Sequence, residues 1–181
     1  TVDERADKIV AAMSDAEKVG QLVVIGVHGT SINEDMKYML GEYHFGGVVL
    51  FDRNMQSKEQ VKQLLGDLQS YAKKNEKIGL FLAVDQEGGA VARMQDGLVK
   101  VPAAQDLGTQ DVSVAENYAK QASQELAELG FNLNFAPVVD LGLTYGRSFS
   151  QNDPEHVVQY AGTVAKAYES NGLQFSFKHF P

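Results

Sequence analysis

The chain has 181 residues, with 16 Lys and Arg against 24 Asp and Glu, so its formal net charge is −8. This charge argues against nucleic acid as a main partner, and a content of 44% hydrophobic residues excludes disorder of the whole chain. The sequence lacks cysteine, which rules out disulfides and thiolate chemistry but leaves both the cytoplasm and the cell envelope open as compartments. No apolar run reaches the ~18 residues needed to cross a bilayer, so we expect no membrane span.

The chain is predicted to open with two helices and then to alternate short strands with longer helices. Apolar residues recur at helical spacing over residues 2–13, and Ser14 followed by Glu17 forms a capping box for a second short helix. The strands are predicted from continuous apolar runs, typical of a parallel sheet covered on both faces, and the helices from amphipathic patterns. In chain order we expect a strand at 22–27, a helix at 31–44, a strand at 48–51, a helix at 57–74, a strand at 80–84, a helix at 112–129, a strand at 131–139, a helix at 154–171 and a strand at 173–179.

Five parallel strands separated by helices fit either a doubly wound sheet or part of a (β/α)8 TIM barrel. Two features favour the barrel: no Gly-x-Gly-x-x-Gly motif follows the first strand, and candidate functional residues follow at least three different strands. A complete barrel needs about 250 residues, and this sequence ends directly after the fifth predicted strand. We therefore expect an α/β fold in which residues 1–181 form a single unit, the N-terminal part of a barrel with about five β/α units, truncated after strand five.

The most distinctive candidate site follows the strand at residues 80–84. Asp85 comes at the end of that strand, Gly88 and Gly89 allow a tight turn or a close approach to a ligand, and Arg93 comes shortly after. Ligands bind at the carboxyl ends of parallel strands, where Asp85 can accept two hydroxyl hydrogen bonds and Arg93 can donate several. The alternative interpretation is a solvated loop with a surface Asp–Arg pair.

Polar residues also follow the fourth and fifth predicted strands. Asp140 ends the fourth strand and Arg147 follows it, where the alternative to a role in a site is a buried Asp–Arg pair that fixes the loop. Lys178 and His179 end the fifth strand. Adjacent residues of a regular strand point to opposite faces, so placing both side chains in one site requires a local irregularity. The alternative for this pair is a fraying strand end with a packed histidine.

The remaining polar residues predict no metal site and no cofactor. His28, His44 and His156 stand singly, without a second histidine or a carboxylate at ligand spacing. Asp85 and Glu87 could suggest a divalent ion, but they supply two carboxylates where calcium takes about six to eight oxygen ligands.

As a set, five strings of the sequence closely resemble glycoside hydrolase family 3. They are GGVVLF at residues 46–51, AVDQEGG at 83–89, NFAPVVD at 134–140, RSF at 147–149 and KHFP at 178–181. Each string alone is weak, but all five occur in the family's order across nearly the whole chain. The strings DQEGG and KHFP are similar to the β-N-acetylglucosaminidase branch of the family rather than to the β-glucosidases.

The resemblance implies a retaining glycosidase whose polar sugar pocket includes Asp85, Arg93, Arg147, Lys178 and His179. In that pocket Asp85 accepts hydrogen bonds from sugar hydroxyls. The family hydrolyses through a glycosyl-enzyme intermediate on an Asp nucleophile, and in this branch a His paired with an Asp is the acid/base. By the resemblance both groups come after Pro181, so we assign no catalytic residue within this chain and expect the chain alone to be inactive.

The expected function of the complete protein is a retaining β-N-acetylglucosaminidase that removes terminal GlcNAc from peptidoglycan-derived glycans. Two alternatives stay open: a non-catalytic sugar-binding module, and a β-glucosidase-like exo-hydrolase of the same family. The expected partner is a GlcNAc-containing oligosaccharide. The open edges of a partial barrel also predict either self-association or a C-terminal remainder that covers them.

Overall fold

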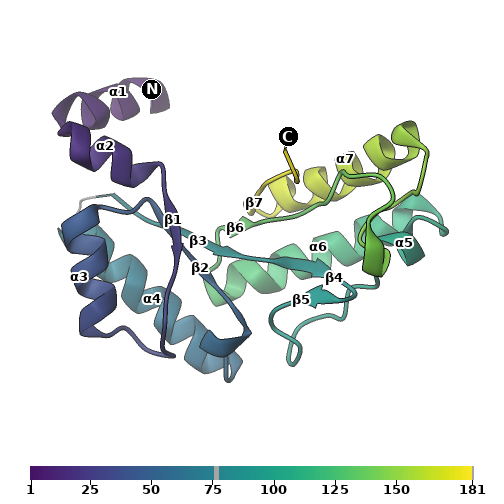
Figure 1. Cartoon of the computed structure of the whole chain (residues 1–181), viewed down its shortest axis with the longest axis horizontal. Coiled ribbons are helices and arrows are strands. Elements are labelled where there is room, and N and C mark those ends of the chain that lie inside the picture. The colour runs from purple at the N-terminus through teal and green to yellow at the C-terminus, as the bar shows by residue number, and fades with distance from the viewer. Residues whose placement is uncertain (76–77, 181) are drawn as a thin grey trace.

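The computed structural model of the chain describes residues 1–75 and 78–180. Its centre is a five-stranded parallel sheet with the order β1-β2-β3-β6-β7 (Figure 1). The strands are β1 (Val24–Gly26), β2 (Gly47–Leu50), β3 (Phe81–Val84), β6 (Leu133–Asn134) and β7 (Gln174–Phe175). Among these described strands the spatial order follows the chain order without the reversal of a doubly wound sheet, so the architecture is that of a barrel.

The middle of the sheet is buried on both faces. All four residues of β2 are buried, and the side chains of Val48, Leu50 and Leu82 are at most 1% exposed. The pairing of β2 with β3 covers the full length of both strands. Apolar and largely β-branched residues favour such a strand, because their side chains pack well on a pleated surface.

Helices flank the sheet (Figure 1), and the N-terminal helix at residues 2–12 buries none of its residues. The long helices α4, α6 and α7 bury Leu64, Leu126 and Val164 respectively, and α6 packs along α7. The helices and turns are α1 (Val2–Ala12), α2 (Asp15–Gln21), α3 (Glu34–Tyr43), η1 (Asp52–Asn54), α4 (Lys58–Asn75), α5 (Ala104–Leu107), α6 (Val112–Leu129), η2 (Thr144–Gly146) and α7 (Pro154–Ser170). Within the described residues, no helix combines the length and the apolar character needed to cross a membrane.

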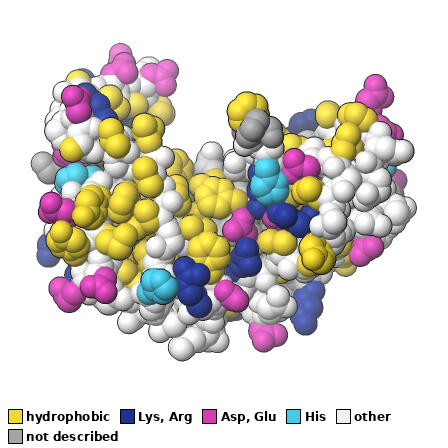
Figure 2. All heavy atoms as spheres, viewed as in Figure 1, with side chains coloured by type: hydrophobic (Ala, Val, Ile, Leu, Met, Phe, Trp, Pro, Cys, Tyr) yellow, Lys and Arg dark blue, Asp and Glu magenta, His cyan; other side chains and the backbone are white. Residues whose placement is uncertain are grey.

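The hollow between the two halves of the chain leaves apolar surface uncovered. Figure 2 shows hydrophobic side chains exposed along this hollow. Phe81 and Phe177 are each 49% exposed and Val139 is 38% exposed, while β1 and β7 are the two edges of the sheet. The fold is therefore a partial (β/α)8 barrel, as the sequence predicts.

Three strands are shorter than their apolar runs predict. The runs at residues 22–27, 131–139 and 173–179 contain strands of three, two and two residues. β6 ends at Asn134, and Pro137, which lies further along the second run, has no N–H with which to resume a regular ladder. The first run also departs from the predicted burial on both faces, because Leu22 lies before β1 and is 86% exposed.

The connection between β3 and α6 contains a hairpin that the sequence pattern does not predict. β4 (Gln86–Gly88) and β5 (Val91–Ala92) pair in antiparallel fashion directly after β3. Gly88 and Gly89 have φ values of 104° and 55°, and a Cβ atom on Gly88 would lie 2.7 Å from the carbonyl oxygen of Pro102. These two glycines therefore let the hairpin turn and pack against the loop that follows.

Candidate functional site

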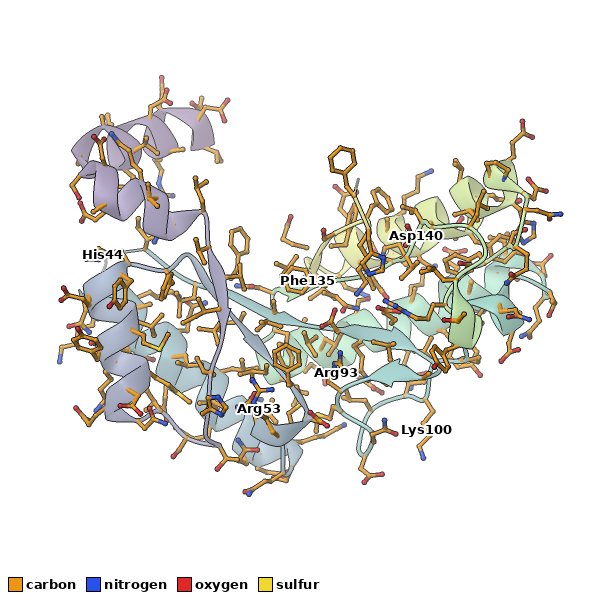
Figure 3. The ribbon with its side chains drawn as sticks, viewed as in Figure 1. His44, Arg53, Arg93, Lys100, Phe135 and Asp140 are labelled. Atoms are coloured by element: carbon orange, nitrogen blue, oxygen red, sulfur yellow. The ribbon has the colours of Figure 1, made fainter. Side chains whose placement is uncertain are left out.

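Polar side chains gather at the carboxyl ends of the parallel strands, which is where barrels bind their ligands. Asp85 directly follows β3, and Lys178 and His179 lie beyond β7. Asp140 lies beyond β6 (Figure 3). An isolated parallel bridge between Val138 and Lys178 keeps the last two segments side by side after the regular strands end.

Lys178 lies between two carboxylates. Its ammonium nitrogen is 2.8 Å from Oδ1 of Asp85 and 2.6 Å from Oε1 of Glu87. The side chains of Lys178, Asp85 and Glu87 are 14%, 19% and 7% exposed. Ionic hydrogen bonds are stronger in a largely buried environment than in water. The contacts of Lys178 with the two carboxylates therefore join the β3–β4 segment firmly to the segment that follows β7.

Glu87 also forms a bidentate pair with Arg147. Nε of Arg147 donates to Oε2 at 2.9 Å, and Nη2 donates to Oε1 at 2.8 Å. Burial raises the pKa of Glu87, but the hydrogen bonds and charges of Arg147 and Lys178 outweigh it, so the pKa of this carboxyl lies below its usual value. The same pair raises the pKa of Arg147. A carboxyl group with a lowered pKa suits an ion-pair acceptor and not a proton donor.

His179 is oriented by Asp140. Its Nδ1 lies 2.6 Å from Oδ2 of Asp140, and its backbone N–H donates to the same oxygen at 3.1 Å. Its Nε2 lies 3.3 Å from Nη2 of Arg147. A guanidinium group only donates, so these partners assign the ring proton to Nδ1 and the lone pair to Nε2. Burial raises the pKa of Asp140, but the His179 hydrogen bonds and nearby positive charge hold that pKa below its usual value.

The Lys178 and His179 side chains both reach the cluster even though the two residues are adjacent. A regular strand would direct them to opposite faces. Both residues lie beyond β7, where the regular strand has ended, so the strict alternation of faces does not apply to them; the peptide bond between them is cis.

Arg93 lies beside Asp85 and keeps unused donor capacity. Its Nη2 is 3.8 Å from Oδ2 of Asp85, whereas Lys178 holds the other oxygen. Nε of Arg93 is buried and has no hydrogen-bond partner among the described residues. The guanidinium carbon of Arg93 lies 5.4 Å from the centre of the Phe51 ring, and that of Arg53 lies 4.6 Å from the same centre. Figure 3 labels both arginines. A ligand that offers acceptor oxygens could therefore satisfy Arg93.

Buried amides fix the backbone from which these charged groups extend. The Asn134 side chain accepts the N–H of Gln86 at 3.0 Å and donates to its carbonyl oxygen at 2.9 Å. The Gln86 side chain in turn bonds both the N–H and the carbonyl of Met94. Both amides are nearly inaccessible to solvent, so β4, β6 and the Arg93 loop are held together by bonds that water does not compete for.

The structure brings all five predicted pocket residues into one cluster, together with the carboxylates of Glu87 and Asp140. Asp140 bonds His179 and Arg147 bonds Glu87, so no direct Asp140–Arg147 salt bridge fixes the loop in this part of the chain. Glu87 could be found from its spacing, because residues two apart on an extended segment share a face and Asp85 is already a candidate. The sequence holds no comparable signal for the pairing of Asp140 with His179.

The cluster offers hydrogen-bond donors and acceptors but no metal-binding group. In the part of the chain that the structure describes, no three His, Asp or Glu side chains come together as metal ligands. The carboxylates of Asp85, Glu87 and Asp140 instead engage cationic or imidazole groups. An array of this kind suits a ligand with several hydroxyl groups, each of which both donates and accepts.

Comparison with known proteins places this geometry within a family. The protein-family model described as "Glycosyl hydrolase family 3 N terminal domain" matches residues 15–181. The chain belongs to glycoside hydrolase family 3. The family resemblance predicted from the five sequence strings is thereby confirmed.

Curated relatives are longer than this chain. A beta-hexosaminidase of Stenotrophomonas maltophilia strain K279a is 34% identical over 171 residues, which cover 88% of this chain and 50% of the relative. Beta-hexosaminidase A of Pseudoalteromonas piscicida is 33% identical over 164 residues, which cover 84% of this chain and 27% of the relative. The chain thus spans half or less of the length of these relatives.

Solved structures share the architecture over nearly the whole chain. A glycoside hydrolase family 3 beta-N-acetylglucosaminidase from Paenibacillus sp. str. FPU-7 has a TM-score of 0.88 at 33% identity, covering 94% of this chain and 34% of that one. NagZ from Neisseria gonorrhoeae in complex with N-trifluoroacetyl-D-glucosamine has a TM-score of 0.80 at 31% identity, covering 88% and 49%. The partial barrel is therefore a fold that this chain shares with glycosidases of the family.

Proposed function

We propose that the complete protein is a retaining β-N-acetylglucosaminidase that removes terminal GlcNAc from peptidoglycan-derived glycans, and that this chain supplies its sugar pocket. The observation that carries the proposal is the cluster around Asp85, Lys178 and His179 at the carboxyl ends of barrel strands in a family 3 chain. The beta-hexosaminidase names of relatives and the glucosamine derivative bound to the gonococcal NagZ support an amino sugar as the ligand.

Each side chain has a chemical role in the proposed pocket. Oδ2 of Asp85 faces away from Lys178's bond and accepts a sugar hydroxyl, while Lys178 and Arg93 donate to ring substituents. Nε2 of His179 already accepts from Nη2 of Arg147, so a sugar hydroxyl that bonds this nitrogen takes the place of the guanidinium group. Hydrogen bonds to sugar hydroxyls that strengthen in the transition state increase turnover as well as binding.

In this proposal the residues of the chain bind sugar, and the bond-breaking groups come from polypeptide that follows residue 181. A retaining glycosidase needs a free nucleophile and a protonated acid, with the two carboxyl groups about 5–5.5 Å apart in the common case. Asp85 and Glu87 both contact Lys178, and the lowered pKa of Glu87 is opposite to what a general acid requires.

The test uses the complete protein, meaning this chain with all polypeptide encoded together with it. We expect hydrolysis of nitrophenyl β-GlcNAc with kcat/KM at least ~100-fold above that for the matched β-glucoside, because a pocket built for the acetamido group leaves polar groups unpaired without it. Proton NMR of the released sugar is expected to show retention. Preference for the glucoside would support the β-glucosidase-like alternative, and sugar binding without hydrolysis would support a binding module.

We further propose that a C-terminal remainder of the polypeptide covers the edges β1 and β7 and the exposed apolar surface. Both edges are open in this chain, and unpaired strand edges associate readily with other polypeptide. The relatives are at least twice as long as the part that matches, which supports a remainder over self-association as the cover.

Sedimentation of the isolated 181-residue chain at low micromolar concentration tests this second proposal. We expect association or poor cooperativity of unfolding, since the apolar surface then lacks its cover. A cooperative monomer of 19.7 kDa would show that the five strands form a self-sufficient sheet.

A further inference from the structure

We propose that Glu87 is a positioning residue, which sets the places of Lys178 and Arg147 in the sugar pocket without touching the sugar. The inference rests on the proposed function, because it concerns how the same pocket is organised. It goes beyond the pocket residues predicted from the sequence, which do not include Glu87.

Burial separates Glu87 from the groups that can meet a ligand. Its side chain is 7% exposed, compared with 19% for Asp85 and 34% for Arg93. Its oxygens are also occupied: Oε1 takes bonds from Lys178 at 2.6 Å and from Arg147 at 2.8 Å, and Oε2 takes Nε of Arg147 at 2.9 Å. A carboxylate that is covered and already accepts three bonds acts on other side chains rather than on a ligand.

Charge explains why the pocket needs this carboxylate. Lys178 and Arg147 come from different parts of the chain, and both approach Oε1 of Glu87. Two cations that close together repel unless an anion lies between them. Asp85 also contacts Lys178, at 2.8 Å, but it is placed to serve the ligand. Glu87 therefore neutralises the charges of Lys178 and Arg147, and Oδ2 of Asp85 stays free for a hydroxyl.

The influence of Glu87 extends to His179 through Arg147. Nη2 of Arg147 bonds Glu87 at 2.8 Å and also lies 3.3 Å from Nε2 of His179. A shift of the guanidinium group would thus change the surroundings of the imidazole lone pair. The β4 strand that carries Glu87 is itself fixed by the buried Asn134–Gln86 bonds, so the anchor sits on a rigid base, as precise positioning requires.

The experiment replaces Glu87 in the complete protein by an isosteric amide, Glu87→Gln. An amide has one acceptor oxygen and places an NH2 donor against Lys178 or Arg147, so at least one of the three bonds is lost. We expect kcat/KM for nitrophenyl β-GlcNAc to fall ~10- to 100-fold, because displacement of a positioning group by about 1 Å has effects of this size. Glu125→Gln is the matched control: Glu125 accepts a backbone N–H from Val99 at 2.6 Å and lies outside the cluster.

A double-mutant cycle distinguishes positioning from a merely structural role. If Glu87 acts through Arg147, the Glu87→Gln/Arg147→Ala double variant loses little more kcat/KM than Arg147→Ala alone, since coupled residues are not additive. Losses that are additive both in this cycle and in the equivalent cycle with Lys178→Ala, or a Glu87→Gln variant with unchanged kcat/KM, would overturn the inference. Should Glu87→Gln not fold, Glu87→Asp keeps the charge and shortens the reach, and the same comparison applies.

A crystal structure of the Glu87→Gln variant provides a readout that does not depend on activity. Displacement of the Lys178 ammonium or the Arg147 guanidinium supports positioning, and unchanged places for both overturn it. If the wild-type complete protein hydrolyses no β-GlcNAc substrate, the proposed function fails while this structural comparison still decides the role of Glu87.

Discussion

Replacement of Asp85 by alanine in the complete protein removes the carboxylate that accepts sugar hydroxyls in the proposed pocket. Lys178 holds Oδ1 at 2.8 Å, whereas the nearest cation to Oδ2 is Arg93 at 3.8 Å. Oδ2 is therefore the oxygen with acceptor capacity to spare. Lys178 retains Glu87 at 2.6 Å, so the variant is expected to keep its fold.

The size of the effect follows from the bonds that disappear. Each hydrogen bond from a hydroxyl to a charged acceptor contributes about 1.5–3 kcal/mol, and Oδ2 has room for one or two of them. With one or two such bonds lost and Lys178 still held by Glu87 at 2.6 Å, we take about 3–4 kcal/mol as the net effect on the transition state. That corresponds to a decrease in kcat/KM of roughly 100- to 1000-fold.

The assay measures kcat/KM for nitrophenyl β-GlcNAc together with thermal unfolding. Asp85→Asn keeps the shape and is expected to lose less than Asp85→Ala, because an amide oxygen still accepts one bond. Asp67→Ala is the matched control, since Asp67 is a helix-surface acceptor for Gln63. Wild-type kcat/KM in a folded Asp85→Ala variant would remove Asp85 from the pocket and refute this reasoning.

Three further predictions concern activity, core and pH. The isolated 181-residue chain is expected to leave nitrophenyl β-GlcNAc intact, and turnover that Asp85→Ala abolishes would show that catalytic groups lie within it. Leu82→Ala empties a site that is 1% exposed and should destabilise the complete protein by about 3 kcal/mol, seen as a fall in melting temperature. The pKa of Asp140 is lowered in the folded state. The ionised Asp140 carboxylate therefore stabilises the fold at pH values above its ordinary pKa of 3.8, and this stabilisation disappears as the pH falls through the lowered pKa of the folded state. The free energies of unfolding of wild type and Asp140→Asn, measured with urea, should therefore differ at neutral pH and converge in acid. A difference that stays constant with pH would contradict a lowered pKa for Asp140.

The helices and the central strands could be predicted from the sequence because local signals determine them. The predicted helix at residues 112–129 coincides with α6, which ends at Gly130 in the left-handed conformation. The predicted capping box is present too, with Ser14 and Glu17 bonded to each other's backbone N–H groups. β3 lies within its predicted run at residues 80–84, and β2 is shifted by one residue from its run at 48–51, because the two strands pair with each other along their full length.

The ends of β6 and β7 and the ion pairs of the site could not be predicted in the same way. Strand ends depend on which neighbour continues the ladder, and after β6 the pairing continues only as an isolated bridge from Val138 to Lys178 and scattered backbone bonds among the described residues. Ion pairs depend on contacts between segments far apart in the chain, such as Glu87 with Arg147. Sequence spacing indicates that these groups lie at one end of the sheet, but it does not indicate which acid meets which base.

The pairing of charges within the cluster explains how binding and bond cleavage can belong to different parts of one polypeptide. Glu87 is engaged by two cations and Asp140 by an imidazole, and Asp85 keeps one oxygen on Lys178. A nucleophile must aim a free lone pair at the anomeric carbon, and an acid must hold its proton near neutral pH. Carboxylates restrained in this way meet neither requirement, and in the proposed pocket Oδ2 of Asp85 is the oxygen that remains to hold a hydroxyl group in a fixed position. Such a segment can orient the sugar before any reacting group approaches, which is the order that preorganised catalysis requires.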